Sequence, residues 1–302
     1  MGQTPPMRGS TEAESAAGPP ARATADEPFR DGSRTPADPT PTPPTPPTLP
    51  ALDVLGEGLG AAATVLRANA VAAGLDTPVP TCPGWTVRDL VAHQGMVHRW
   101  AASHLRRMPV TDTSALEQSG RGSADPLGWF DEGATDLLQA IVDAPDDLTG
   151  RPFLLDAPAP RLFWARRQCH ETTIHAVDAL AARLGRPPRA EETWIRPAVA
   201  LDGIDELLTG FVPRPRQGVT HDPGLRLLVA PEPAARAWLL DLAPDRPPVT
   251  TRLARSPGDA APEADAVITG GPVEVLLRLW SRAGEPRDAV ERWWADTVTV
   301  AW

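Results

Sequence analysis

The chain has 302 residues, a formal net charge of −10 at pH 7, 37 prolines and two cysteines. This length allows about two domains, each with a core of its own, and the lack of any run of about 18 apolar residues excludes a membrane-spanning helix. Two cysteines are too few for a disulfide framework or a zinc ribbon, and a sequence pI of about 5.1 argues against a broad nucleic-acid-binding surface.

Residues 1–49 are predicted to form a disordered tail. Thirteen of the 37 prolines lie in the first 50 residues, together with many threonines and few large apolar side chains. A segment of this composition cannot bury enough apolar surface to offset the entropy lost on ordering. The tail also lacks the apolar stretch of about 7–15 residues found in a signal peptide, so we expect a cytoplasmic protein.

Apolar residues recur at helical spacing in four segments between residues 50 and 186. Gly74 and Gly185 follow the first and fourth segments as helix stops, and Thr86 with Asp89 has the pattern of a capping box at the start of the second. A polar loop that includes residues 119–123 precedes the third. We therefore expect a four-helix bundle over 50–186, with helices at about 52–73, 86–107, 126–142 and 161–184.

Residues 190–302 are predicted to form a second, smaller domain, which makes the expected fold class α+β. Short apolar or alternating runs bounded by Pro, Gly and Asp indicate strands, and a proline at the first turn is typical of a helix start. The expected helices span about 196–208 and 272–282, and the expected strands about 225–229, 237–241, 249–253 and 266–269, with a last strand near 297–301.

Glu171 and His175 lie four residues apart in the fourth predicted helix, which places them on one face. His93 lies at the edge of the apolar stripe of the second helix. Two imidazoles and one carboxylate are a ligand set that catalytic zinc sites use, and Asp178 is spaced to orient the imidazole of His175. Periodicity alone leaves two alternatives open, a solvated Glu–His pair and a histidine satisfied within the core.

The order of these residues resembles one known family. The run TCPGWTVRDLVAH at 81–93, followed by HETTIHAVD at 170–178, closely resembles the mycothiol-dependent maleylpyruvate isomerase family, whose members have a DinB-like metal-binding bundle and a small sterol-carrier-like α+β domain. The resemblance implies that His93, Glu171 and His175 are metal ligands and that mycothiol is the thiol cofactor. Mycothiol is made by actinobacteria, whose genomes are often GC-rich, and the lysine-free, arginine-rich composition agrees with such a source.

The run of residues 270–282 resembles the last helix of the family, which ends in Trp-x-Arg. The resemblance makes Arg282 a candidate catalytic residue that grips an acidic substrate or the thiol, because arginine binds carboxylates in a bidentate manner. The alternative is a cation that only favours the C-terminal end of its helix. His98 and His170 face away from the predicted site on their helices, and Cys82 and Cys169 are expected to be small buried side chains.

The predicted activity is a metal-assisted thiol reaction. A divalent metal, expected from its ligand set to be zinc, would keep mycothiol as thiolate. The thiolate is expected to add to an electrophilic small molecule, which leads to cis–trans isomerisation or thiol transfer. The alternative function is a non-catalytic, metal-binding regulatory or binding protein on the same fold. No nucleic acid or membrane partner is expected, and the chain is expected to be a monomer or weak dimer.

Overall fold

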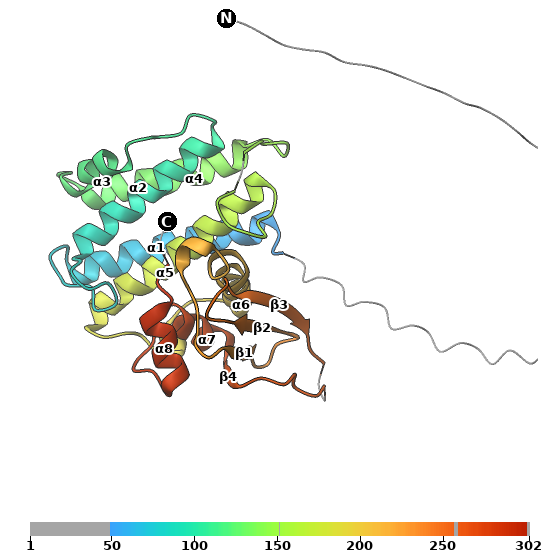
Figure 1. The fold of residues 1–302 in the computed structure, drawn as a ribbon. Helices are drawn as coiled ribbons and strands as arrows, with labels where there is room; N and C mark the ends of the chain where they lie inside the picture. The colour runs from blue at the N-terminus through green and yellow to red at the C-terminus, as the bar shows by residue number, and fades with distance from the viewer. Residues whose placement is uncertain (1–48, 151, 257–258, 301–302) are drawn as a thin grey trace, which may run out of the picture. The chain divides into compact units, whose positions relative to one another are not determined.

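The computed structural model describes residues 49–150, 152–256 and 259–300. The first half consists of helices, and the longest of them, α5 (Pro160–Leu184), packs against α1 (Leu52–Ala73) (Figure 1). α2 (Val87–Leu105) packs against α4 (Pro126–Asp143) and also contacts α5. The predicted 1–49 tail lies outside the described residues except for Leu49.

Local signals in the sequence set the ends of these helices. The Thr86 hydroxyl accepts a hydrogen bond from the backbone N–H of Asp89, whose carboxylate accepts from the N–H of Thr86, so the capping box at the start of α2 is formed. α5 ends at Gly185, which has a φ of 69°, a left-handed conformation that glycine adopts without steric cost. These caps fix where α2 and α5 begin and end, and thus which of their residues face the bundle interior.

The structure corrects the prediction of a polar loop around residues 119–123. A further helix, α3 (Thr113–Arg121), covers most of that segment and packs against α2. The Asp112 side chain caps it by accepting a hydrogen bond from the N–H of Ala115. Glycine and serine within 119–123 suggested a loop, but this N-cap and the packing against α2 outweigh their low helix propensity.

The second half contains a four-stranded sheet with the order β3-β2-β1-β4. β1 pairs antiparallel with β2 and parallel with β4, and β2 pairs antiparallel with β3. The α+β fold class is therefore confirmed. The elements of this half are α6 (Pro197–Glu206), β1 (Leu225–Pro231), β2 (Arg236–Leu242), β3 (Val249–Ala254), β4 (Ala266–Gly270), α7 (Pro272–Leu279) and α8 (Ala289–Thr297).

The predicted last strand near 297–301 is wrong over the residues that the structure describes, since 298–300 form no strand and Thr297 ends α8. Asp288 caps this helix at the N–H of Glu291, and the helix buries Trp294. The alternation of valine and threonine after residue 296 fits a strand, but it specifies no neighbouring strand with which to pair. The predicted helix at 272–282 ends earlier, at Leu279.

One buried apolar cluster extends through both halves. It includes Leu59 of α1, Val177 of α5, Ile204 of α6, Trp238 of β2 and Leu276 of α7. The described residues accordingly form one compact unit, and the division into domains at 50–186 and 190–302 stays a prediction from the sequence. No helix in the described part of the chain is long and apolar enough to cross a membrane.

Candidate metal centre and its cleft

The structure brings His93, Glu171 and His175 together. His93 lies in the second turn of α2, and the other two residues lie on the facing side of α5. Glu171 Oε1 lies 3.3 Å from His175 Nε2 and 3.9 Å from His93 Nε2. One ligand atom from each of the three residues lies within 4.8 Å of the others, a spacing from which small shifts would let all three reach one ion.

The chemistry of these donors fits a divalent metal ion. Burial acts to lower the pKa of His93, but the nearby carboxylates of Glu117 and Glu171 raise it to about 9 when no ion is bound. The pKa of His175 is raised against its burial by Asp178 and Glu171. The pKa of Glu171 is held well below its usual range despite burial, because both imidazoles lie beside it. The site thus stabilises positive charge, and an ion would replace two protons.

A carboxylate lies behind each imidazole. His175 Nδ1 is 3.0 Å from Asp178 Oδ2, which leaves Nε2 free to face Glu171. His93 Nδ1 is 3.8 Å from Oε2 of Glu117 on α3. Such carboxylates fix the tautomer and the ring orientation of metal-binding histidines. The sequence predicted this role for Asp178, but it missed Glu117, which falls in the segment expected to be a loop.

Arg282 lies next to this site and binds Asp178. Its Nε–H and Nη2–H donate to the two Asp178 carboxylate oxygens at 2.9 and 3.1 Å. Nη1 donates to the carbonyl of Trp280, and Nη2 also approaches Cys82 Sγ at 3.5 Å. A guanidinium has five N–H donors, so one Nη1 hydrogen is left without a contact among the described residues. The arginine therefore holds Asp178 in place and has limited capacity for a ligand.

Cys82, His175 and Asp178 form a second group with metal-ligand spacing. Cys82 Sγ donates to Asp178 Oδ2 at 3.2 Å, and Thr81 Oγ1 donates to Oδ1 at 2.6 Å. The guanidinium of Arg282 already neutralises this carboxylate. Burial and then the charge of Asp178 raise the pKa of the Cys82 thiol to about 12. We therefore interpret this group as the support of His175 and not as an ion site.

The three candidate ligands lie in a cleft of about 450 Å³. The indole of Trp85 forms one wall, with its ring centroid 5.0 Å from that of His93 and 6.1 Å from that of His175. The opposite wall comes from the C-terminal part of the chain. The residues lining the cleft are Thr81, Cys82, Pro83, Trp85, His93, Glu171, Ile174, His175, Leu279, Trp280, Ser281, Arg282, Ala295, Val298, Thr299 and Val300. Most of the wall area is thus apolar, while the polar groups gather around the histidines.

The remaining histidines and Cys169 lie away from the three ligands. His98 is fully buried and 2.8 Å from Thr172 Oγ1, and desolvation lowers its pKa to about 3. His170 pairs with Asp202 at 2.7 Å. Cys169 is buried, and a Cβ added at Gly58 of α1 would lie 2.7 Å from its sulfur. His98 and His170 therefore face other parts of the interior, as their helical spacing predicts, and Cys169 packs between α1 and α5.

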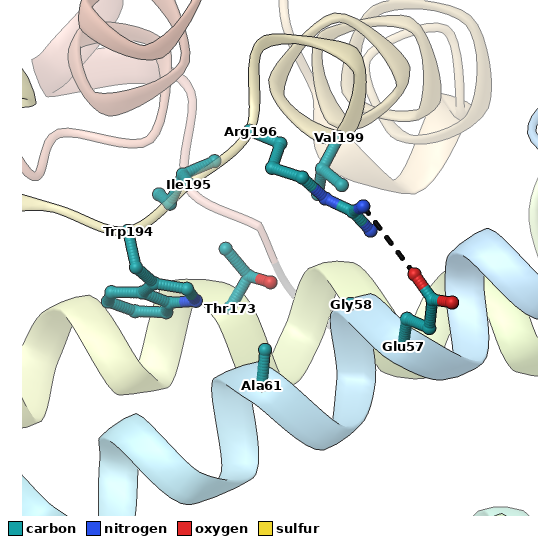
Figure 2. Close-up of a pocket in the computed structure, with 8 residues that line it drawn as sticks. All are labelled: Glu57, Gly58, Ala61, Thr173, Trp194, Ile195, Arg196 and Val199. Carbon is teal, nitrogen blue, oxygen red and sulfur yellow. Dashed lines mark ion pairs between the residues drawn. The ribbon is translucent and has the colours of Figure 1, made fainter.

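A smaller hollow of about 270 Å³ lies between α1, α5 and the segment 194–199 (Figure 2). An ion pair between Arg196 and Glu57, 3.5 Å long and largely exposed, spans one side of it. It is lined by Glu57, Gly58, Ala61, Thr173, Trp194, Ile195, Arg196 and Val199. These residues include no histidine or cysteine, so the hollow offers no metal-binding donor set.

The fold is a helical bundle that contains a His–Glu–His group with metal-ligand spacing, continued by a small α+β part. Residues 55–180 match the sequence model of the mycothiol maleylpyruvate isomerase N-terminal domain. This part of the chain is therefore similar to that domain family, as the motifs at 81–93 and 170–178 predict. Among curated protein sequences, none matches the chain.

Two solved structures are similar in fold. One is the mycothiol-dependent maleylpyruvate isomerase, with 15% sequence identity and a TM-score of 0.50, and the match covers 76% of this chain and 88% of that one. The other is a histidine-to-alanine variant of the mycothiol-dependent maleylpyruvate isomerase, with 16% identity, a TM-score of 0.52, and coverage of 83% and 92%. At these identities the likeness shows the fold alone.

Proposed function

We propose that this protein is a metal-dependent enzyme that uses mycothiol, of the maleylpyruvate isomerase type. Its reaction is the addition of the thiolate to an electrophilic small molecule, followed by cis–trans isomerisation or by thiol transfer. The proposal rests on one observation: His93, Glu171 and His175 lie close together inside an open cleft. The family match of residues 55–180 supports the choice of thiol.

The three side chains would hold a divalent ion, and we expect zinc, because two imidazoles and a carboxylate are a ligand set of catalytic zinc sites. When bound, such an ion lowers the pKa of a coordinated thiol enough for the thiolate to form near neutral pH. Asp178 accepts the Nδ1 hydrogen of His175 and so directs its Nε2 lone pair toward the site. We expect the protein to act in the cytoplasm, where thiols are kept reduced.

The residues of the cleft provide the other requirements of the reaction. Trp85, Ile174 and Trp280 provide apolar walls that exclude water from the reacting groups. For isomerisation, the thiolate sulfur bonds to one carbon of a conjugated double bond, the remaining single bond rotates, and the C–S bond then breaks to return the thiolate and the trans alkene. Arg282, whose charge is balanced by Asp178, offers its remaining Nη1 hydrogen at the wall to an acceptor on the substrate or the thiol.

Metal analysis of untagged protein, followed by calorimetry with mycothiol, tests the proposal. We expect one divalent ion per chain, thiol binding only when the ion is present, and conversion of maleylpyruvate or conjugation of a general electrophile that depends on both. A protein that binds one ion but neither binds nor transfers a thiol would instead be the non-catalytic metal-binding alternative. A protein that binds no ion refutes the proposal.

A further inference from the structure

Arg167 holds the oxygen of Glu171 that faces away from the histidines. The two residues lie one turn apart on α5, and Arg167 Nη2 donates to Glu171 Oε2 at 2.7 Å. The other oxygen, Oε1, is the one nearest to His93 and His175. The side chains of Arg167 and Glu171 are 0% and 6% exposed, so water does not compete for this ion pair.

Groups from the C-terminal half of the chain hold the Arg167 guanidinium in turn. Its Nη1 pairs with Oε2 of the buried Glu206, at the end of α6. The guanidinium carbon lies 5.0 Å from the ring centroid of Phe211 and 5.9 Å from that of Trp280. A planar guanidinium packed by two rings and bonded to carboxylates on two helices has little freedom to rotate.

We propose that Arg167 is a positioning residue that fixes the Glu171 carboxylate, so that Oε1 alone is offered to the metal. The inference rests on the ion site of the proposed function, but it concerns how tightly and in which geometry the ion is held. Without Arg167, the carboxylate can rotate about its terminal bond and present both oxygens or neither. Outer groups of this kind commonly change metal affinity about 10–100-fold when they are removed.

The chain offers a matched control in the preceding residue. Arg166 is also buried on α5 and also pairs with acids of α6, through Nε to Asp202 at 2.9 Å and through Nη2 to Asp205 at 3.0 Å. It makes no hydrogen bond or ion pair to His93, Glu171 or His175 among the described residues. Loss of Arg166 removes a buried charge but leaves Asp202 paired with His170 and Asp205 paired with Arg252. Loss of Arg167 removes a buried charge that contacts a proposed ligand.

The experiment measures Co²⁺ affinity by competition with a chromophoric chelator, on full-length, metal-stripped wild type and on Arg167→Met and Arg166→Met. We expect Arg167→Met to bind Co²⁺ about 10–100-fold more weakly and to change the visible Co²⁺ spectrum, which reports the ligand geometry. We expect Arg166→Met to keep the wild-type spectrum and affinity, even if its melting temperature falls as much as that of Arg167→Met. Arg167→Lys keeps the charge and is expected to restore part of the affinity.

Unchanged affinity and spectrum in folded Arg167→Met would overturn the proposal, and so would equal losses in both methionine variants. If Arg167→Met does not fold, Arg167→Lys and Glu206→Gln decide in its place: reduced affinity with an altered spectrum supports the role, and wild-type values in both refute it. A wild type that binds no ion refutes the proposed function as well. If the wild type binds Co²⁺ but no thiol, only the proposed function is refuted, and the role of Arg167 is still decided by the variants.

Discussion

Replacing Arg282 tests whether this arginine holds the buried Asp178 in place or is only a cation at the surface, because the two cases predict different losses of stability. The Asp178 side chain is 0% exposed and that of Arg282 is 19% exposed, and two hydrogen bonds join them. Replacing Arg282 with methionine keeps most of the apolar stem but removes the charge. Asp178 is then left as a buried carboxylate whose nearest cation is a histidine.

The expected cost is large because the carboxylate cannot reach water. Removal of one partner from a buried ion pair costs about 3–5 kcal/mol. For a folded unit of this size, each kcal/mol lowers the melting temperature by about 2–4 °C, so Arg282→Met should melt about 6–20 °C lower than wild type. Thr81 and Cys82 also donate to Asp178, which places the expected value toward the lower end of this range.

Calorimetry in the presence of a chelator measures this effect without a contribution from bound metal. Arg67→Met is the matched control, because Arg67 pairs with Asp131 on the surface, where both side chains are more than 40% exposed. Exposed pairs contribute about 0–1 kcal/mol, so this variant should melt within about 4 °C of wild type. The double variant Arg282→Met, Asp178→Asn should recover part of the loss. An Arg282→Met protein as stable as Arg67→Met would refute the reasoning.

Three further predictions concern the ion and the tail. Replacing His175 with alanine should abolish stoichiometric metal in elemental analysis, whereas His98→Ala and His170→Ala should retain it; metal loss in the latter two would contradict the assignment. The pKa of His93 is raised from 6.5 to about 9 in the ion-free fold, so its stabilisation is complete below about pH 6.5 and is lost as pH rises through 9. The melting temperature of chelated protein should therefore fall between these pH values, while metal affinity rises with pH because protons no longer compete; a flat melting profile would refute this. A chain starting at Leu49 should melt as full-length protein does, and a drop of many degrees would show that the tail packs on the fold.

The long helices could be predicted from the sequence because several signals agree in each. α1, α4 and α5 begin and end within one residue of the predicted bounds, since apolar periodicity over 18 residues or more coincides with a proline or glycine at an end. The short elements α3 and α8 were missed. Each has nine residues, and a stretch of that length is stabilised mainly by tertiary packing that the sequence does not display.

The candidate ligands could be predicted, but most of the residues that hold them could not. The four-residue spacing of Glu171 and His175 places both on one helical face, and the motif at 81–93 added His93. Asp178 follows from the same periodicity. Arg167 lies on α5 beside Glu171, but its significance depends on Glu206, which is 39 residues away in the sequence. No periodic pattern connects residues that far apart, so such contacts emerge only once the chain is folded.

The side chains that hold the two proposed ligands of α5 are themselves contacted by residues outside 55–180, the segment that matches the family model. Glu171 is held by Arg167, which is packed by Phe211 and Trp280, and His175 is held by Asp178, which binds Arg282. The family match ends at residue 180. The proposed ligands therefore lie within the segment that matches the family model, while residues of the C-terminal half contact the side chains that hold them.

The same division applies to the cleft, since the ligand-bearing wall comes from residues 81–175 and the opposite wall from residues 279–300. A change of substrate needs a change of shape and polarity around the reacting atoms, not a change of the ion or the thiol. Two members of the family can thus share His93, Glu171 and His175 and still accept different electrophiles. Leu279 and Val298 line the wall opposite the candidate ligands, so under the proposed function we expect changes at these two positions to alter which electrophile is accepted.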